Sequence, residues 1–174
     1  WLGGRKPNSF TISAYWSEQN DAYYIWQNAT RHFRSTGVAV GLGTRLAWPD
    51  PYFTFYGELG YQRYDLKDWS SFVMSNGTSN TLSLKLVFAR SSVDQPTYPR
   101  RGSDFSISVQ LTPPFSLWDG KNYEDQTMSD TVRYKWIEFN TWQLKAQWFL
   151  PLTNGHKPVL MTKAEMGYLR NYNK

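Results

Sequence analysis

Residues 94–111 read DQPTYPRRGSDFSISVQL, a stretch that joins a turn to a strand. Pro96 and Pro99 fix φ and lack amide donors, so the first half cannot continue a β-ladder. The second half alternates strictly between apolar and polar residues, which predicts a strand with two unlike faces. One face carries Phe105, Ile107, Val109 and Leu111, and the other carries Ser106, Ser108 and Gln110. In a soluble sheet the apolar face meets a protein core, whereas in a membrane barrel it meets lipid.

The same alternation recurs along the whole chain, and no segment shows the period of an amphipathic helix. The segments that alternate are residues 8–16, 37–48, 53–64, 81–90, 105–111, 134–152 and 159–172. Within 134–152 the apolar positions change parity, which predicts a bulge near Asn140 or a departure of the chain from the membrane. The sequence therefore predicts an all-β protein with seven strands in this stretch.

The composition favours strands as the membrane-crossing elements. The 174 residues are 18% aromatic, but mean hydropathy is only -0.61. No apolar run approaches the roughly 18 residues of a transmembrane helix. A transmembrane strand needs only about 9–11 residues, of which every second one is apolar. A helical membrane protein is thus excluded, and a membrane barrel is compatible with the low hydropathy.

Charge and cysteine content exclude further classes. The chain has no cysteine, which removes disulfides, thiol catalysis and thiolate metal sites. The net charge is +5, but the basic residues are scattered rather than gathered in a stripe, so no nucleic-acid partner is expected. His32 and His156 both lie in predicted connections and neither has a carboxylate and nucleophile pattern around it. We therefore expect no enzyme, no cofactor and no metal site.

The lengths of the connections indicate the architecture. Long connections at residues 17–36, 67–79 and 113–133 alternate with short ones at 48–52, 95–102 and 153–158. Consecutive antiparallel strands would gather all long connections at one end of the sheet and all short ones at the other. Outer-membrane barrels show this asymmetry, with short periplasmic turns and longer extracellular loops. The pattern predicts a transmembrane antiparallel up-and-down β-barrel.

The two faces fit this interpretation. Burying unpaired charges in a solid core is costly, so we predict that the polar face lines a water-filled lumen. The residues predicted to face the lumen are Arg45, Glu58, Gln62, Lys85, Gln110, Lys145, Gln147, Lys163 and Glu165. The residues predicted to face lipid are Leu82, Leu84, Leu86, Phe105, Ile107, Val109, Leu111, Leu144 and Trp148. A soluble antiparallel sheet with one wet face is the alternative, because alternation alone does not exclude it.

Rings gather near the predicted strand ends, as in the aromatic girdles of membrane barrels. They are Trp16, Trp48, Tyr52, Phe53, Tyr61, Tyr64, Phe88, Trp136, Trp148 and Tyr168. Seven strands do not close a bacterial barrel, whose strand number is even, and an open edge is not tolerated in lipid. We therefore expect residues 1–174 to be part of one barrel domain, with further strands on both sides in a longer protein.

Two turns resemble those of a known family. Residues 1–9, WLGGRKPNS, place Gly3, Gly4 and Pro7 before an alternating strand, as in the early periplasmic turn of BamA-type outer-membrane assembly barrels. Asp94, Pro96, Pro99 and Gly102 resemble the mid-barrel turn of the same family. The resemblance covers nearly the whole chain in strand order and corresponds to roughly the third to ninth strands of a sixteen-strand barrel. The stretches RKPN at residues 5–8 and TPPFSLW at residues 112–118 resemble the version of this family in Bacteroidota.

The resemblance implies a function without enzymatic chemistry. Such barrels fold and insert unfolded outer-membrane proteins into the bacterial outer membrane, without ATP or a cofactor. The implied partners are outer-membrane lipids, unfolded client proteins and accessory assembly lipoproteins, the last docking beside the short turns. The family's periplasmic repeat domains, its Val-Arg-Gly-Phe-type motif and its strand seam are not within these residues. An outer-membrane secretion pore, a porin or nutrient transporter, and a soluble sugar-binding β protein remain alternatives.

Overall fold

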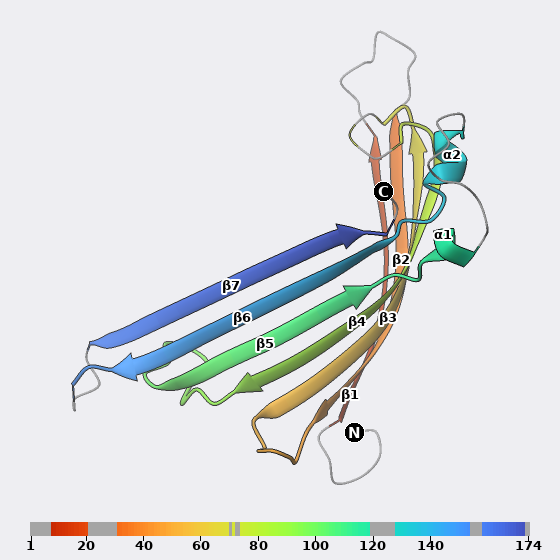
Figure 1. The fold of residues 1–174 in the computed structure, drawn as a ribbon. Helices are drawn as coiled ribbons and strands as arrows, with labels where there is room; N and C mark the ends of the chain where they lie inside the picture. The colour runs from red at the N-terminus through yellow and green to blue at the C-terminus, as the bar shows by residue number, and fades with distance from the viewer. Residues whose placement is uncertain are drawn as a thin grey trace.

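The computed structural model describes residues 8–20, 31–69, 71, 74–118, 128–153 and 158–172. They form a single sheet of seven antiparallel strands in the order of the sequence. The strands are β1 (Asn8–Asn20), β2 (His32–Arg45), β3 (Phe53–Lys67), β4 (Gly77–Ser91), β5 (Gly102–Leu111), β6 (Phe139–Pro151) and β7 (Val159–Asn171). Strand direction changes steadily across the sheet, from β1–β4 to the strongly inclined β5–β7 (Figure 1). The predicted all-β, up-and-down arrangement is confirmed.

The long connections and the short ones lie at opposite ends of the sheet, as their alternating lengths predicted. Each strand pairs with its neighbour in sequence, so connections after β1, β3 and β5 lie at one end and those after β2, β4 and β6 at the other. We call these the long-connection end and the short-turn end. Among the described residues the sheet is open, because β1 pairs with β2 alone and β7 with β6 alone.

The first four strands extend farther toward the long-connection end than the apolar pattern indicated. In β1 and β2 the ladder continues through Glu18↔Arg34 to Asn20↔His32. In β3 and β4 it continues through Asp65↔Thr78 to Leu66↔Gly77. Polar residues pair their backbones as well as apolar ones do, but they give no alternation that a sequence pattern detects. The predicted boundaries therefore mark the apolar band rather than the ends of the ladder.

The strand predicted over residues 134–152 begins instead at Phe139. The preceding residues leave its ladder and pair with the edge of β4: Asn80 N donates to Lys135 O and Ile137 N donates to Asn80 O, both at 2.9 Å. This departure explains the change of parity. A bulge is not the cause, because β6 keeps a continuous register with both β5 and β7.

Two short helices lie in the connection between β5 and β6, beside the sheet toward its long-connection end (Figure 1). They are α1 (Phe115–Trp118) and α2 (Asp130–Arg133), each of four residues. Glu138 holds α1 in place, because its buried carboxylate accepts hydrogen bonds from Ser116 N and Ser116 Oγ at 2.6 Å each. Within the described ranges, no helix has the length and apolar character needed to span a membrane.

The sheet has almost no hydrophobic core of its own. Among the residues that the structure describes, the buried apolar side chains are Leu66, Met74, Ala146 and Phe149. Large apolar side chains are instead exposed along the strands, for example Ile12 at 68% and Met166 at 68%. Contiguous apolar surface of this kind marks contact with a protein or a membrane. Its stabilisation must come from a non-aqueous neighbour outside this sheet.

Candidate functional site: two faces of the sheet and the turns that join its strands

The register divides the side chains into two faces, because residues directly opposite each other point the same way. One row across five strands is Ile12, Val40, Leu59, Leu84 and Leu111. The adjacent row on the other side contains Gly41, Glu58, Lys85 and Gln110. We call the two sides the apolar face and the polar face.

All residues predicted to face lipid lie on the apolar face, and all residues predicted to face the lumen lie on the polar face. The structure thus brings each set together on one side. That the polar face meets a lumen and the apolar face meets lipid stays a prediction. Among the girdle rings, Trp16, Tyr61, Trp148 and Tyr168 lie on the apolar face, whereas Tyr64 lies on the polar face and packs at 6.0 Å from Phe33.

Charges on the polar face are paired loosely and remain in contact with solvent. Glu165 on β7 lies 3.1 Å from Lys163 and 4.0 Å from Lys145, and all three side chains are about half exposed. Pairs of this kind contribute about 0–1 kcal/mol each, since water screens them. Their exposure is what a water-filled interior requires. The polar face is therefore suited to contact water or an extended polar chain rather than a packed core.

Small residues on β2 form a strip that rings from neighbouring strands cover. The strip is Gly37, Ala39, Gly41 and Gly43. A Cβ atom at Gly41 would lie 2.6 Å from Tyr56 Cζ, and one at Gly37 would lie 2.6 Å from Tyr15 Cζ. Tyr56 is held over the strip by a 2.6 Å hydrogen bond from its hydroxyl to Glu58. This strip lies on the polar face, and sequence reasoning did not foresee that aromatic rings cover it.

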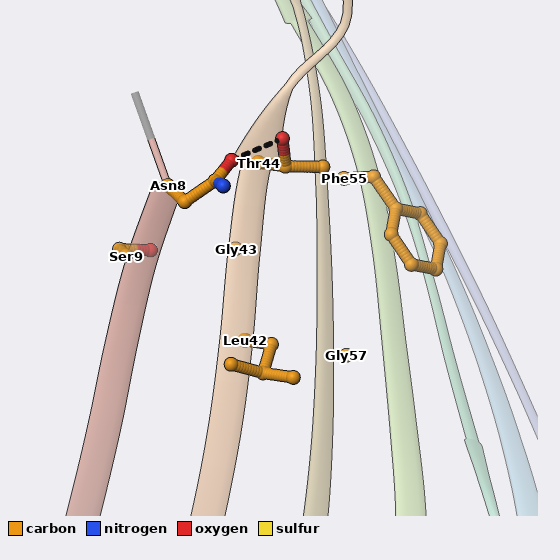
Figure 2. A pocket seen from close by; sticks show the side chains of 7 residues that line it. All are labelled: Asn8, Ser9, Leu42, Gly43, Thr44, Phe55 and Gly57. Atoms are coloured by element: carbon orange, nitrogen blue, oxygen red, sulfur yellow. Dashed lines mark hydrogen bonds between the residues drawn. The ribbon is translucent and has the colours of Figure 1, made fainter. Parts of the chain in front are cut away.

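The apolar face has a notch near the short-turn end of β2 and β3 (Figure 2). Gly57 has no side chain, so an opening of about 420 Å³ forms between Leu42 and Phe55. A hydrogen bond of 2.7 Å from Thr44 Oγ1 to Asn8 Oδ1 lies at its end, as Figure 2 shows. The notch is mostly apolar and has room for part of a hydrocarbon chain.

The turn over residues 94–102 is built around Asp94. Its Oδ1 accepts hydrogen bonds from Arg100 N at 2.9 Å and from Arg101 N at 3.4 Å. These amides, that of Arg100 above all, favour the charged carboxylate and hold the pKa of Asp94 below its ordinary value. Gly102 closes the turn at a φ of 110°, where a Cβ would lie 2.8 Å from Val93 Cα.

The structure therefore brings Asp94 and Gly102 together at the base of the turn, while Pro96 and Pro99 lie in the bend between them. The other turn that carried the family resemblance, with Gly3, Gly4 and Pro7, lies outside the described residues. The region 153–158 can be described only at its two ends, and His156 also lies outside the described part of the chain.

Arg90 ties this turn to the preceding short turn. Its Nε lies 3.0 Å from Asp50 Oδ2, and its Nη1 donates to Ser92 Oγ at 3.1 Å and to Ser103 Oγ at 3.3 Å. Its guanidinium also lies 5.6 Å from the ring centroid of Tyr52. Sequence reasoning missed this tie, since its partners are separated by up to 40 residues and no local pattern links them.

His32 lies among polar side chains at the long-connection end of β1 and β2. His32 Nδ1 lies 3.4 Å from Glu18 Oε1 and 3.3 Å from Asn20 Oδ1, in an exposed polar group. Over the ranges that the structure describes, no cluster of three His, Cys, Asp or Glu side chains is arranged to hold a metal ion. The arrangement offers two contrasting surfaces and a set of braced turns.

Comparison with known proteins identifies the sheet. The model of the Omp85 superfamily domain matches residues 4–174. The crystal structure of BamA from Haemophilus ducreyi lacking POTRA domains 1–3 superposes with a TM-score of 0.62 at 17% identity. The match covers 95% of this chain and 30% of that one, so this chain spans less than a third of its length. At this identity the likeness shows a shared fold. No curated protein sequence matches.

Proposed function

Because this chain belongs to the Omp85 superfamily and is an outer-membrane β-barrel protein of bacteria, we propose that it forms part of the wall of a barrel that assembles and inserts other outer-membrane proteins. The proposed wall comprises the described strands and belongs to a barrel of sixteen strands. The barrel works without ATP, a cofactor or an enzymatic step.

The observation that carries this proposal is the two-faced sheet of a superfamily domain. Its apolar face carries exposed large apolar side chains on β1–β4, β6 and β7 and partly exposed ones on β5, and its polar face presents solvated charges. A curved sheet of this kind separates lipid from water. An unfolded client can satisfy its backbone by pairing with an open strand edge of the barrel, because unpaired strand edges are templates for further strands.

No external energy source is required by this mechanism. Unpaired backbone groups are costly in lipid, so a client gains free energy as each of its strands is paired and its barrel closes. The assembly barrel has only to offer an edge and disturb the nearby lipid. The residues described here would supply the rigid wall, and the braced short turns would face the accessory lipoproteins.

The purified protein, reconstituted into vesicles of phosphatidylethanolamine and phosphatidylglycerol, tests the proposal. A urea-unfolded eight-strand outer-membrane protein is added without nucleotide, and its folding is followed by the shift in electrophoretic mobility of unheated samples. Folding faster than in empty vesicles is the expected result. Equal rates, together with stable ion conductance in planar bilayers, would favour a porin. A requirement for ATP would contradict the nucleotide-independent mechanism.

A further inference from the structure

The turn over residues 94–102 presents Tyr98 in its bend. This side chain is 86% exposed, more than any other large apolar or aromatic side chain among the residues that the structure describes. Its backbone has a φ of 56°, a left-handed conformation that a bulky residue adopts rarely and at a cost in free energy. Glycine would adopt this φ without that cost. The turn therefore displays an exposed ring at a position where folding alone favours a residue without one.

Hydrogen bonds fix the backbone on both sides of Tyr98. Gln95 Nε2 donates to Tyr98 O at 2.7 Å. Asp94 Oδ1 accepts from Arg100 N at 2.9 Å, and Asp94 N donates to Arg101 O at 3.2 Å. The backbone that carries the ring is thus held in one conformation before any partner binds. Pre-organisation of this kind lowers the entropy cost of binding.

Two cationic side chains accompany the ring. Arg100 and Arg101 are exposed, and only their backbone amides are used by Asp94. Their guanidinium groups form no ion pair with any residue that the structure describes. Two positive charges therefore exceed the one negative charge of Asp94, and the next acid, Asp104, lies within β5 opposite Ser91. Tyr and Arg are enriched in the hot spots of protein interfaces, and guanidinium groups bind carboxylates with two parallel hydrogen bonds.

The bend lies beyond the level of the rings that border the apolar face at the short-turn end. Trp148 on that face stands opposite Ser103, and Ser92 N donates to Ser103 O at 2.8 Å across the base of the turn. Rings such as Trp148 occupy the membrane–water interface in barrels. Tyr98 lies in the chain beyond this base, on the aqueous side of the interface. A protein segment can reach it there.

We propose that Tyr98, Arg100 and Arg101 form a docking site for an acidic, extended segment of another protein in the aqueous space at the short-turn end. Carboxylates of the segment pair with the two guanidinium groups, and an apolar side chain of the segment packs on the ring of Tyr98. The inference rests on the proposed function, because it requires that the apolar face meets lipid and that the short turns project from the bilayer.

Peptide binding to the purified full-length protein in phosphatidylcholine nanodiscs tests the proposal. The probe is a fluorescein-labelled peptide of glutamates around one central leucine, and the reference peptide has glutamine in place of every glutamate. Binding is measured by fluorescence anisotropy. The acidic peptide should bind about tenfold more tightly than the reference, because charge-assisted hydrogen bonds are stronger than neutral ones.

Two variants separate the contributions of charge and ring. R100Q/R101Q keeps the backbone amides that Asp94 uses, and it should reduce the affinity for the acidic peptide to that of the reference. Tyr98→Gly suits the φ of 56°, so it should raise the urea midpoint of unfolding while weakening the binding of both peptides. A ring with only a structural role would give a lower midpoint instead.

The matched control is K145Q/K163Q, which removes the same charge from the polar face. It should bind the acidic peptide as the unaltered protein does. The mobility shift of unheated protein shows that each variant is folded.

A dye beside Tyr98 distinguishes a protein partner from a membrane surface. The sequence has no cysteine, so Thr97→Cys carries a single polarity-sensitive dye at an exposed position. Its emission should be that of a dye in water, should not be quenched by spin-labelled lipid headgroups, and should shift to the blue when the acidic peptide binds. Quenching by the spin-labelled lipids would show that the bend rests in the bilayer and would overturn the inference.

Three further results would overturn it: equal affinity for the two peptides, unchanged affinity in R100Q/R101Q and Tyr98→Gly, or an equal loss in the control. Client insertion measured on the same samples separates this inference from the proposed function. Insertion without selective peptide binding would remove the docking site alone. Selective peptide binding without insertion would remove the proposed function alone.

Discussion

Replacement of Gly41 by alanine should destabilise the sheet, because Tyr56 occupies the space above this glycine. The new Cβ would lie 2.6 Å from Tyr56 Cζ. Carbon atoms in favourable contact are about 3.5–4.0 Å apart, so the ring must move by about 1 Å. A shift of this size would stretch or break the 2.6 Å hydrogen bond from the Tyr56 hydroxyl to Glu58.

Two opposing terms set the magnitude. Loss of a hydrogen bond to a charged group costs about 1.5–3 kcal/mol. Replacement of glycine by alanine in a strand returns about 0.5–1 kcal/mol of backbone entropy. The net loss of unfolding free energy should therefore be about 0.5–2.5 kcal/mol.

Equilibrium unfolding in urea, followed by tryptophan fluorescence in vesicles, measures this loss. The matched control is Gly60→Ala, also on the polar face, where the new Cβ would lie 3.4 Å from Ser83 Oγ and 3.7 Å from Ala39 Cβ. This variant should be neutral or slightly stabilising. In a Tyr56→Ala background, Gly41→Ala should lose its cost, since the two positions are coupled through one contact. Equal stability of the two glycine variants would refute the reasoning.

Three further predictions concern the faces and the mid-barrel turn. The sequence has no cysteine, so Lys85→Cys should react in vesicles with a water-soluble maleimide while the neighbouring Leu84→Cys should not; equal labelling would contradict the assignment of the faces. Gly102→Ala should lower the unfolding free energy by about 1–3 kcal/mol because φ there is 110°, and an unchanged urea midpoint would show that the turn tolerates a Cβ. The depressed pKa of Asp94 means that its carboxylate stabilises the turn fully above the ordinary pKa of 3.8, and that this stabilisation is lost as pH falls through the lower folded-state pKa. The rate of hydrogen exchange at the Arg100 amide can be compared between the unaltered protein and Asp94→Asn at each pH. Near neutral pH the exchange should be slower in the unaltered protein, and in acid the two rates should become equal. A difference that stays constant with pH would exclude titration of Asp94.

The extent of the ladders could not be predicted as well as their existence. Alternation is a signal only where one face is apolar, so it ended near Trp16 and Tyr64 while the pairing continued to Asn20 and Lys67. For the same reason the alternation predicted that β6 starts at residue 134. The chain near that residue instead pairs with Asn80 at the edge of β4. A single bridge between residues more than 50 positions apart leaves no trace in local periodicity.

The features of the candidate site also divide into those that the local sequence predicts and those that depend on the alignment of strands. The sequence identified Asp94 and Gly102, because a turn of this kind is closed within a few residues and needs specific backbone angles. It did not identify Arg90 as the tie between two turns, nor the alignment of Arg34, Arg63 and Asp65 around one groove. Those roles arise only when separate strands are aligned, and alignment is set by the register of the whole sheet.

The sequence by itself determined that this protein is a two-faced antiparallel sheet with long connections at one end. The physical reason is that side chains alternate with a period of two and that a short turn forces neighbouring strands to be antiparallel, both of which are local properties. Only the tertiary structure decided which side chains meet across strands, such as Tyr56 over Gly41 and Arg63 beside Thr36. These contacts depend on register, because a shift of one residue would move the side chains of the shifted strand to the opposite face.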